Sequence, residues 1–160
     1  MIGALQLLGT ALPVLYAVCA ILHGTAFGGD RWTRVDPLRR HVLNVTLALH
    51  LAWFAARAGE IGQFPANDSW STVSLIAFST ALLYAFVARV TGHSGSGGVT
   101  LGFVFVVQFL ATGIGAIVPT AREGGMGAWP ITHVAASAVA AAALALSGVH
   151  GILYVLLLNE

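Results

Sequence analysis

Six histidines are the side chains in this sequence best suited to bind a metal, and they stand among few other polar residues. Two of them, His50 and His150, lie inside long apolar segments. At a rise of about 1.5 Å per residue, His50 lies roughly 13 Å and His150 roughly 12 Å from the same end of the expected helices. Imidazoles at matched depth on two helices could bind a haem iron from both sides. The alternative for each histidine is a hydrogen bond to a nearby carbonyl or hydroxyl.

The other four histidines differ in their surroundings. His133 follows "AWPIT" at the start of the last apolar segment, where a ligand from outside the membrane could reach it. His23 and His41 are expected at the membrane interface, and His93 in a glycine-rich loop that water reaches. Of these four, His133 is therefore the one that is accessible to a molecule on the outer side of the membrane.

The elements that must position these histidines lie in a membrane. Apolar types make up 58% of the 160 residues, charged types make up 8%, and lysine does not occur. A soluble domain could not cover its surface with so few charges. A formal net charge of +1 gives no reason to expect nucleic acid as a partner. Cys19 is the only cysteine. The start "MIGALQLLG" lacks the positive charge of a cleaved signal peptide, so we expect the first apolar segment to be retained.

Five segments are long and apolar enough to cross about 30 Å of hydrocarbon as helices. They run over residues 4–27, 41–58, 70–89, 99–118 and 131–158. The connections between them are short, so consecutive helices should be antiparallel neighbours. The sequence therefore predicts an all-α integral membrane protein, with residues 1–160 forming a single domain of about five transmembrane helices.

Arginine placement predicts the orientation of the bundle, because positive residues in short loops stay on the cytoplasmic side. The first loop carries Arg31, Arg34, Arg39 and Arg40, and Arg89 borders the third loop, whereas the second and fourth loops carry only Arg57 and Arg122. We expect a multi-pass protein of a bacterial-type cytoplasmic membrane, with its N-terminus outside and its C-terminus inside. The segment from Arg57 to Ser71 then lies outside.

Small residues are concentrated in the last two apolar segments. The last one contains "HVAASAVAAAALALSGVHG", and the fourth has Gly113 and Gly115 near its end. Small residues let helices approach closely where lipid gives no hydrophobic driving force. We expect the last helix to be buried in the bundle or to contact another membrane subunit.

Two local motifs resemble a known family. The segment "RAGEIGQFPANDSW" resembles the "R…G.FP..N.YE" segment of the CcsA/ResC-type cytochrome c assembly proteins and their relatives of the HemX kind. The corresponding positions here are Arg57, Gly62, Phe64 and Pro65, followed by Asp68 and Trp70. The segment "WPITHVAASAV" is similar to the "W..MHV" start of a later helix in that family. The resemblance covers residues 47–158.

The resemblance implies that the chain handles haem, which such proteins bring across the membrane and present to apocytochrome c. It implies that His133 is the first axial histidine of an outer haem site. It also implies that Arg57 and the Phe64-Pro65 turn shape the surface beside that site, where the Arg57 guanidinium could bind a haem propionate with two hydrogen bonds.

The sequence also departs from the family pattern. Asp68, Trp70 and Ser71 stand where the family has asparagine, tyrosine and glutamate. The tryptophan-rich "WGxxWxWD" loop that holds haem in the family does not occur in this sequence. We therefore expect a second polypeptide to supply the remainder of such a site.

Two functions from different classes follow. The first is a haem-handling cytochrome c assembly protein that acts within a complex. The second is a structural or accessory subunit of a respiratory or photosynthetic electron-transfer complex, in contact with lipid and with membrane subunits that carry haem or chlorin cofactors. The sequence shows no nucleophile–base pair, carboxylate pair or metal cluster, so we do not expect an enzyme.

Overall fold

The computed structural model describes residues 2–24, 36–92, 95–117 and 127–158. These residues form helices α1 (Ile2–Gly24), α2 (Asp36–Ile61), α3 (Ser69–Thr91), α4 (Gly97–Ile117) and α5 (Ala128–Leu158). The described part of the chain contains no strand, which confirms the all-α prediction. Residues 25–27 and 118, which the sequence assigned to helices, lie outside the described residues.

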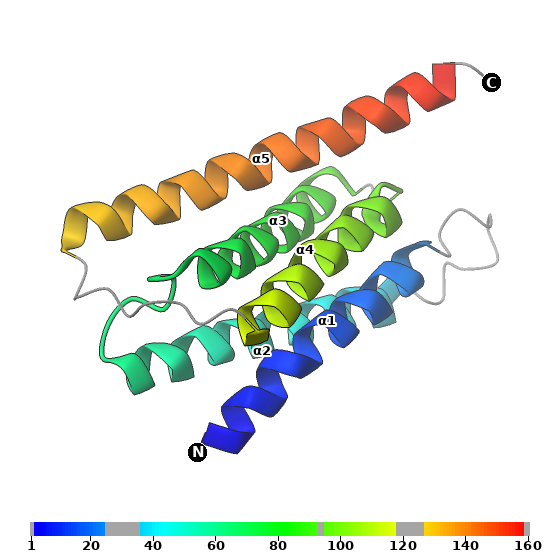
Figure 1. Ribbon diagram of the computed structural model, residues 1–160. Coiled ribbons are helices and arrows are strands. Elements are labelled where there is room, and N and C mark those ends of the chain that lie inside the picture. The colour runs from blue at the N-terminus through cyan, green and yellow to red at the C-terminus, as the bar shows by residue number, and fades with distance from the viewer. Residues whose placement is uncertain (1, 25–35, 93–94, 118–126, 159–160) are drawn as a thin grey trace.

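Each of these helices contains a segment of 19 to 29 residues that is long and apolar enough to cross a membrane. The protein is therefore a multi-pass membrane protein. Successive helices run in opposite directions, so the N-terminus lies at one end of the bundle and the C-terminus at the other (Figure 1). The starts of α1, α3 and α5 and the ends of α2 and α4 lie together on the side of the bundle where the N-terminus lies (Figure 1). We name this side the N-terminal end.

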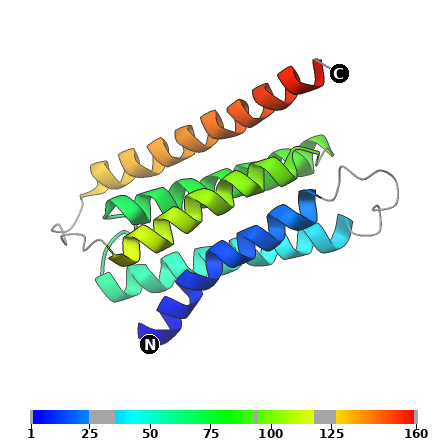
Figure 2. The same cartoon turned by 45° about the vertical axis from the view of Figure 1, so that its right-hand side comes forward.

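The bundle has a four-helix body and one peripheral helix. Helix α1 packs mainly against α4 and α2, and α4 also packs against α3, whereas α2 and α3 contact each other only lightly. Helix α5 lies outside this body and packs almost entirely on α3, with α1 and α2 on the far side (Figure 2). Of the five membrane-spanning segments, the one in α5 has the smallest buried share.

The four-helix body forms because each helix has one buried stripe. In α1 the inward positions alternate in steps of four and three residues, the spacing of a helix face that packs against neighbours. They are Leu5, Gly9, Leu12, Tyr16, Cys19 and His23. On α5 a shorter stripe faces α3 and consists of Ala138, Ala142, Leu146 and Val149. The rest of α5 is largely exposed.

All five helices begin before the residue that the sequence predicted, and the difference is largest for α2 and α5. Helix α2 begins at Asp36 rather than at residue 41, and α5 begins at Ala128 rather than at residue 131. Pro37 and Pro130 lie in the first turns of these helices. Proline is favourable there because the first turn needs no backbone N–H and the ring fixes a helical φ.

Glycines allow close helix contacts at both ends of the bundle. At the end opposite the N-terminus, a Cβ at Gly98 would lie 2.6 Å from the Cα atom of Gly24, so α1 and α4 touch through their backbones. At the N-terminal end, a Cβ at Gly115 would lie 3.0 Å from the Cβ atom of Trp70. Gly113 has open space around it. Of the two glycines that the sequence marked on α4, Gly115 makes the close contact.

Candidate functional site

A half-open pocket of about 440 Å³ lies at the N-terminal end of the bundle, between the starts of α1 and α3 and the ends of α2 and α4. Its polar lining residues are Gln6, Thr10, Arg57, Asp68, Ser71, Ser74, Gln108 and Thr112, and its aromatic ones are Trp53 and Trp70. Polar side chains are costly inside a membrane bundle, and their concentration around one cavity makes this pocket the candidate site.

The turn between α2 and α3 builds one side of the pocket. Gly62 has a φ of +68°, and its N–H donates to the carbonyl of Ala58, which ends α2. A left-handed residue after a helix is easily adopted by glycine. Asp68 then caps the start of α3: its backbone is extended, and its side-chain Oδ1 accepts the N–H of Ser71 at 2.9 Å. These two residues fix where the helices that carry the pocket end and begin.

An ion pair joins the two sides of this turn. Nη2 of Arg57 lies 2.8 Å from Oδ2 of Asp68, and the Ser71 hydroxyl donates to the same oxygen at 2.6 Å. Burial on its own would raise the pKa of Asp68. The hydrogen bonds from the Ser71 hydroxyl and N–H, together with the charge of Arg57, outweigh burial and hold that pKa below its ordinary value. Asp68 is therefore a charged carboxylate at neutral pH.

The ion pair with Asp68 uses only one of the nitrogen atoms of the Arg57 guanidinium. Its Cζ atom lies 5.6 Å from the centre of the Trp53 ring, in a cation–π contact. Its Nε–H is buried and has no acceptor among the described residues. A buried donor without an acceptor is unfavourable, and a water or a ligand oxygen would relieve it. The Arg57 side chain is also 31% exposed, so its remaining N–H groups can donate to a ligand while Nη2 holds Asp68.

A chain of hydrogen bonds leads from the pocket into the centre of the bundle. Ser74 and Gln108 line the pocket, and the Ser74 hydroxyl donates to Oε1 of Gln108 at 2.9 Å. Nε2 of His50 lies 3.1 Å from the Ser74 hydroxyl, and Nδ1 of His50 lies 2.9 Å from the hydroxyl of Tyr16. The chain thus links one residue from each helix of the four-helix body.

The direction of these hydrogen bonds fixes the proton on His50. A hydroxyl has one proton, and Ser74 uses it toward the Gln108 oxygen, so Ser74 must accept from His50. Nε2 of His50 therefore carries the proton, and Nδ1 accepts from Tyr16. Neither ring nitrogen has a lone pair left for a metal in this conformation.

Aromatic rings enclose the same histidine, which is 0% exposed. Its imidazole stacks on Phe54, with ring centres 4.9 Å apart and an interplanar angle of 11°. The rings of Phe78 and Trp53 approach it edge to face at 5.2 Å and 5.9 Å. Hydrogen bonds at both nitrogens and rings around it make His50 a centre of packing between helices.

The hydrogen-bond chain continues from Gln108 to α1. Nε2 of Gln108 donates to the Thr112 hydroxyl at 3.1 Å, and this hydroxyl donates to the carbonyl of Gly9 at 3.5 Å. That carbonyl is available because the residue four positions later is Pro13, which has no N–H to donate to it. A side chain from α4 takes the place of the missing backbone bond.

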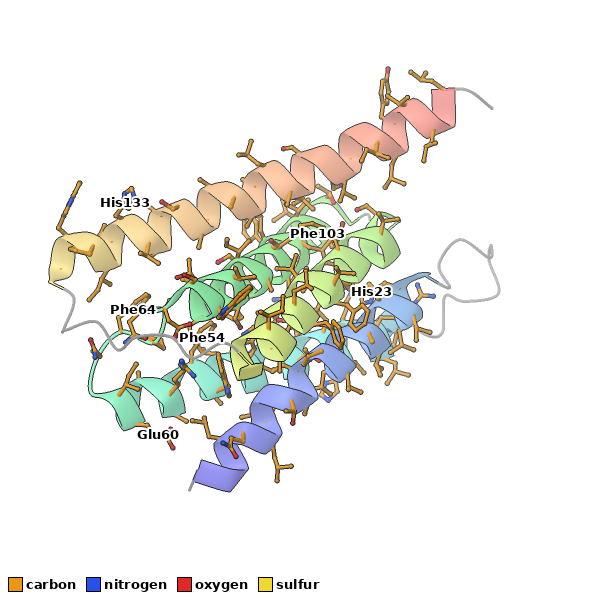
Figure 3. All side chains as sticks on the ribbon, viewed as in Figure 1. His23, Phe54, Glu60, Phe64, Phe103 and His133 are labelled. Atoms are coloured by element: carbon orange, nitrogen blue, oxygen red, sulfur yellow. The ribbon has the colours of Figure 1, made fainter. Side chains whose placement is uncertain are left out.

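The structure brings part of the sequence motif together at this pocket. Arg57, Asp68 and Trp70 line it. Gly62 ends α2, and Phe64 and Pro65 are half-buried in the turn beyond it. Phe64 lies at the same end of the bundle as Phe54 (Figure 3).

The candidate histidines do not come together. His50 is enclosed in the four-helix body, whereas His150 is exposed on α5 and its Nδ1 lies 2.8 Å from the carbonyl of Leu146. His133 is exposed near the start of α5, at the N-terminal end (Figure 3). Haem binding by His50 and His150 as a pair stays a prediction, and it would require both the hydrogen bonds of His50 and the position of α5 to change.

The remaining histidines are placed as follows. His23 is the last residue but one of α1, and it is buried, with Nδ1 2.9 Å from the carbonyl of Cys19. His41 is exposed near the start of α2. His93 lies outside the described residues.

Sequence reasoning missed Tyr16, Ser74 and Gln108, which complete the surroundings of His50. Each is an isolated polar residue in an apolar stretch, such as "FVFVVQFLA" around Gln108. Isolated polar residues in membrane helices face the interior and pair with one another. This tendency to pair is the sequence signal that points to the hydrogen-bond chain around His50.

The described part of the chain holds no group of three or more His, Cys, Asp or Glu residues that could bind a metal ion. No protein-family model, no curated protein and no solved structure matches this chain. The pocket, the hydrogen-bond chain and the sequence motifs are therefore the basis for a functional assignment.

Proposed function

We propose that this protein is a haem-handling subunit of a membrane complex, of the kind that assists cytochrome c assembly. One observation carries the proposal: the pocket beside Arg57 and the exposed ring of His133 lie at the same end of the bundle. These are the two positions to which the sequence resemblance assigns contact with haem. A bound haem would supply a redox-active iron.

The pocket residues fit the edge of a porphyrin and not its iron. No described residue that lines the pocket is histidine, cysteine or methionine, the side chains that commonly bind haem iron. The pocket offers two tryptophan rings and the partly exposed guanidinium of Arg57, which suit a flat ring and an acidic propionate. The role of this pocket is then to hold and orient the acidic edge.

His133 would supply a nitrogen ligand to the haem iron, outside the pocket. Its ring is exposed and has no hydrogen-bond partner among the described residues, so a ring nitrogen is available. His50 and Tyr16 would remain hydrogen-bonded to each other and support the pocket floor through Ser74. A partner subunit would supply a further ligand to the iron.

We place the N-terminal end of the bundle on the outside of a bacterial-type cytoplasmic membrane. The support is the distribution of arginines, because Arg39, Arg40 and Arg89 all lie near the opposite end, in α2 and α3. In this orientation the pocket and His133 face the side on which cytochrome c is assembled.

The test is a haem titration of the protein purified in mild detergent, followed by absorbance. We expect bound haem with a spectrum that changes in His133→Ala and is unchanged in the matched control His150→Ala. Arg57→Gln should weaken haem binding roughly tenfold, the usual worth of a hydrogen bond to a charged group. A low-spin spectrum that is lost in both His50→Ala and His150→Ala would favour the paired site instead. A folded protein that binds no haem would contradict the proposal.

A second candidate, a structural subunit of an electron-transfer complex, is favoured by the outer face of α5. Spaced along one side of this helix are the exposed residues Ala136, Ala140, Ala143, Ser147 and His150. These small residues would allow close approach of another helix, and an exposed histidine inside a membrane-spanning segment is more favourable against protein than against lipid.

This second candidate is tested by co-purification and size analysis in mild detergent. Ala136→Leu or Ala140→Leu should weaken association with a cofactor-bearing membrane partner by about 1–3 kcal/mol through overpacking. Ala52→Leu is the matched control, because Ala52 is an exposed alanine on α2. A monomer that is unaffected by all three changes would contradict this role.

A further inference from the structure

A second pocket, of about 230 Å³, lies at the opposite end of the bundle from the first. Its floor includes the buried residues Leu43, Leu47 and Tyr84, and its rim includes the exposed residues Leu82 and Phe86. It forms between α2 and α3, two helices that contact each other only lightly. The pocket is half-open.

The chemistry of this pocket changes along its length. Arg40 lines it on α2, with Asn44 one turn deeper and Leu47 deeper again. At about 1.5 Å per residue, Leu47 lies roughly 10 Å below Arg40. On α3 the antiparallel direction gives the same order, because Arg89 lines the pocket roughly 10 Å from Leu82. The pocket is therefore cationic at the end of the bundle and apolar toward its middle.

The arginines at the cationic end have no acidic partner among the described residues. None of the described residues that line the pocket is acidic. The guanidinium groups of Arg40 and Arg89 are exposed, and neither forms an ion pair with a described residue. The amide of Asn44 adds a hydrogen-bonding group one turn below Arg40 on α2.

We propose that this pocket binds an anionic phospholipid, with the phosphate between Arg40 and Arg89 and an acyl chain along Leu47, Leu82 and Phe86. A phosphate group matches two guanidinium groups in charge and geometry, and basic pockets between transmembrane helices bind anionic headgroups. The apolar end of the pocket identifies a lipid rather than a free phosphate, because a free anion would gain nothing there. The site is separate from the proposed haem site and does not depend on it.

Native mass spectrometry of the protein with bound lipid tests this site. The probes are phosphatidylglycerol, phosphatidylcholine with the same acyl chains, and soluble glycerol phosphate. We expect phosphatidylglycerol to bind in preference to phosphatidylcholine. Each arginine near an anionic lipid is worth about a fivefold change in binding, so Arg40→Gln with Arg89→Gln should lower this preference roughly 30-fold.

Two matched controls make the test specific. Arg31→Gln with Arg34→Gln removes the same charge from the same basic part of the sequence and should change the preference far less. Leu82→Trp should fill the pocket and expel the lipid, whereas Leu51→Trp, at an exposed leucine of α2 that does not line it, should not. The tryptophan pair decides the question if the arginine variants do not fold.

Three results would overturn the proposal. The first is an equal loss of preference in the two double arginine variants, which would indicate general surface attraction. The second is displacement of phosphatidylglycerol by glycerol phosphate at equal concentration, which would indicate a site for a free anion. The third is unchanged lipid binding in Leu82→Trp.

Discussion

The hydroxyl of Tyr16 on α1 lies 2.9 Å from Nδ1 of His50 on α2, and both side chains are 0% exposed. Through this contact, a helix near the start of the chain is tied to Ser74 on α3 and Gln108 on α4. The contact therefore belongs to a set of hydrogen bonds that joins the whole four-helix body.

Replacing Tyr16 by phenylalanine should destabilise this body, because Nδ1 of His50 would lose its donor. Hydrogen bonds inside membrane proteins average about 0.6 kcal/mol and reach about 1.7 kcal/mol, so we expect a loss in this range. Tyr154→Phe is the control, because Tyr154 is exposed on α5. Unfolding in mixed detergents measures the difference, and equal stability of the two variants would contradict a structural role for the contact.

Two glycine substitutions on α4 should have opposite effects. A Cβ at Gly98 would lie 2.6 Å from the Cα atom of Gly24, so Gly98→Ala should force α1 and α4 apart and lower stability by about 1–3 kcal/mol. Gly102 has nothing within 4 Å of the same position, so Gly102→Ala should raise stability by about 0.5–1 kcal/mol through helix propensity. Thermal unfolding of both variants tests this contrast, and a harmless Gly98→Ala would show that these helices do not touch there.

Acid should weaken the link between α2 and α3. The pKa of Asp68 lies below its ordinary value of 3.8 in the folded protein, so its contribution to stability is complete above that value. As the pH falls from 3.8 through the lower folded pKa, Asp68 gains a proton and the contribution is lost. The midpoint of thermal unfolding should therefore drop in this range in the native protein.

Substitutions separate the charge of Asp68 from its capping role. Asp68→Asn keeps an N-cap for α3 and should remove the part of the acid effect that arises at this residue. Asp68→Ala removes the cap as well and should cost about 1 kcal/mol more. An unchanged pH profile in Asp68→Asn would mean that another group causes the loss.

The proposed orientation predicts opposite labelling of two engineered cysteines. Ser69 lies at the start of α3 and Ser96 just before α4, so they are at opposite ends of the bundle. In a Cys19→Ala background, an impermeant thiol reagent applied to intact cells should label Ser69→Cys and not Ser96→Cys. The reverse pattern would invert the orientation, and equal labelling would contradict the arrangement of helices.

The sequence predicted local features well and long-range contacts poorly. Helix number follows from apolar length alone. The Arg57–Asp68 region could be located because its residues are 11 positions apart and share one turn. The contacts of His50 span 34 residues to Tyr16 and 24 to Ser74, and no local pattern shows which helix faces become neighbours. The extensive contact between α1 and α4 likewise joins elements far apart in the chain.

The hydrogen bonds of His50 also have a consequence for biogenesis. The ribosome delivers Tyr16 and His50 to the membrane before it has made Ser74 and Gln108. Until α3 arrives, the Nε2–H of His50 lacks its acceptor in an environment where an unpaired polar group is unfavourable. The hydrogen bonding between the first two helices and the rest of the bundle is therefore complete only after α3 and α4 have inserted.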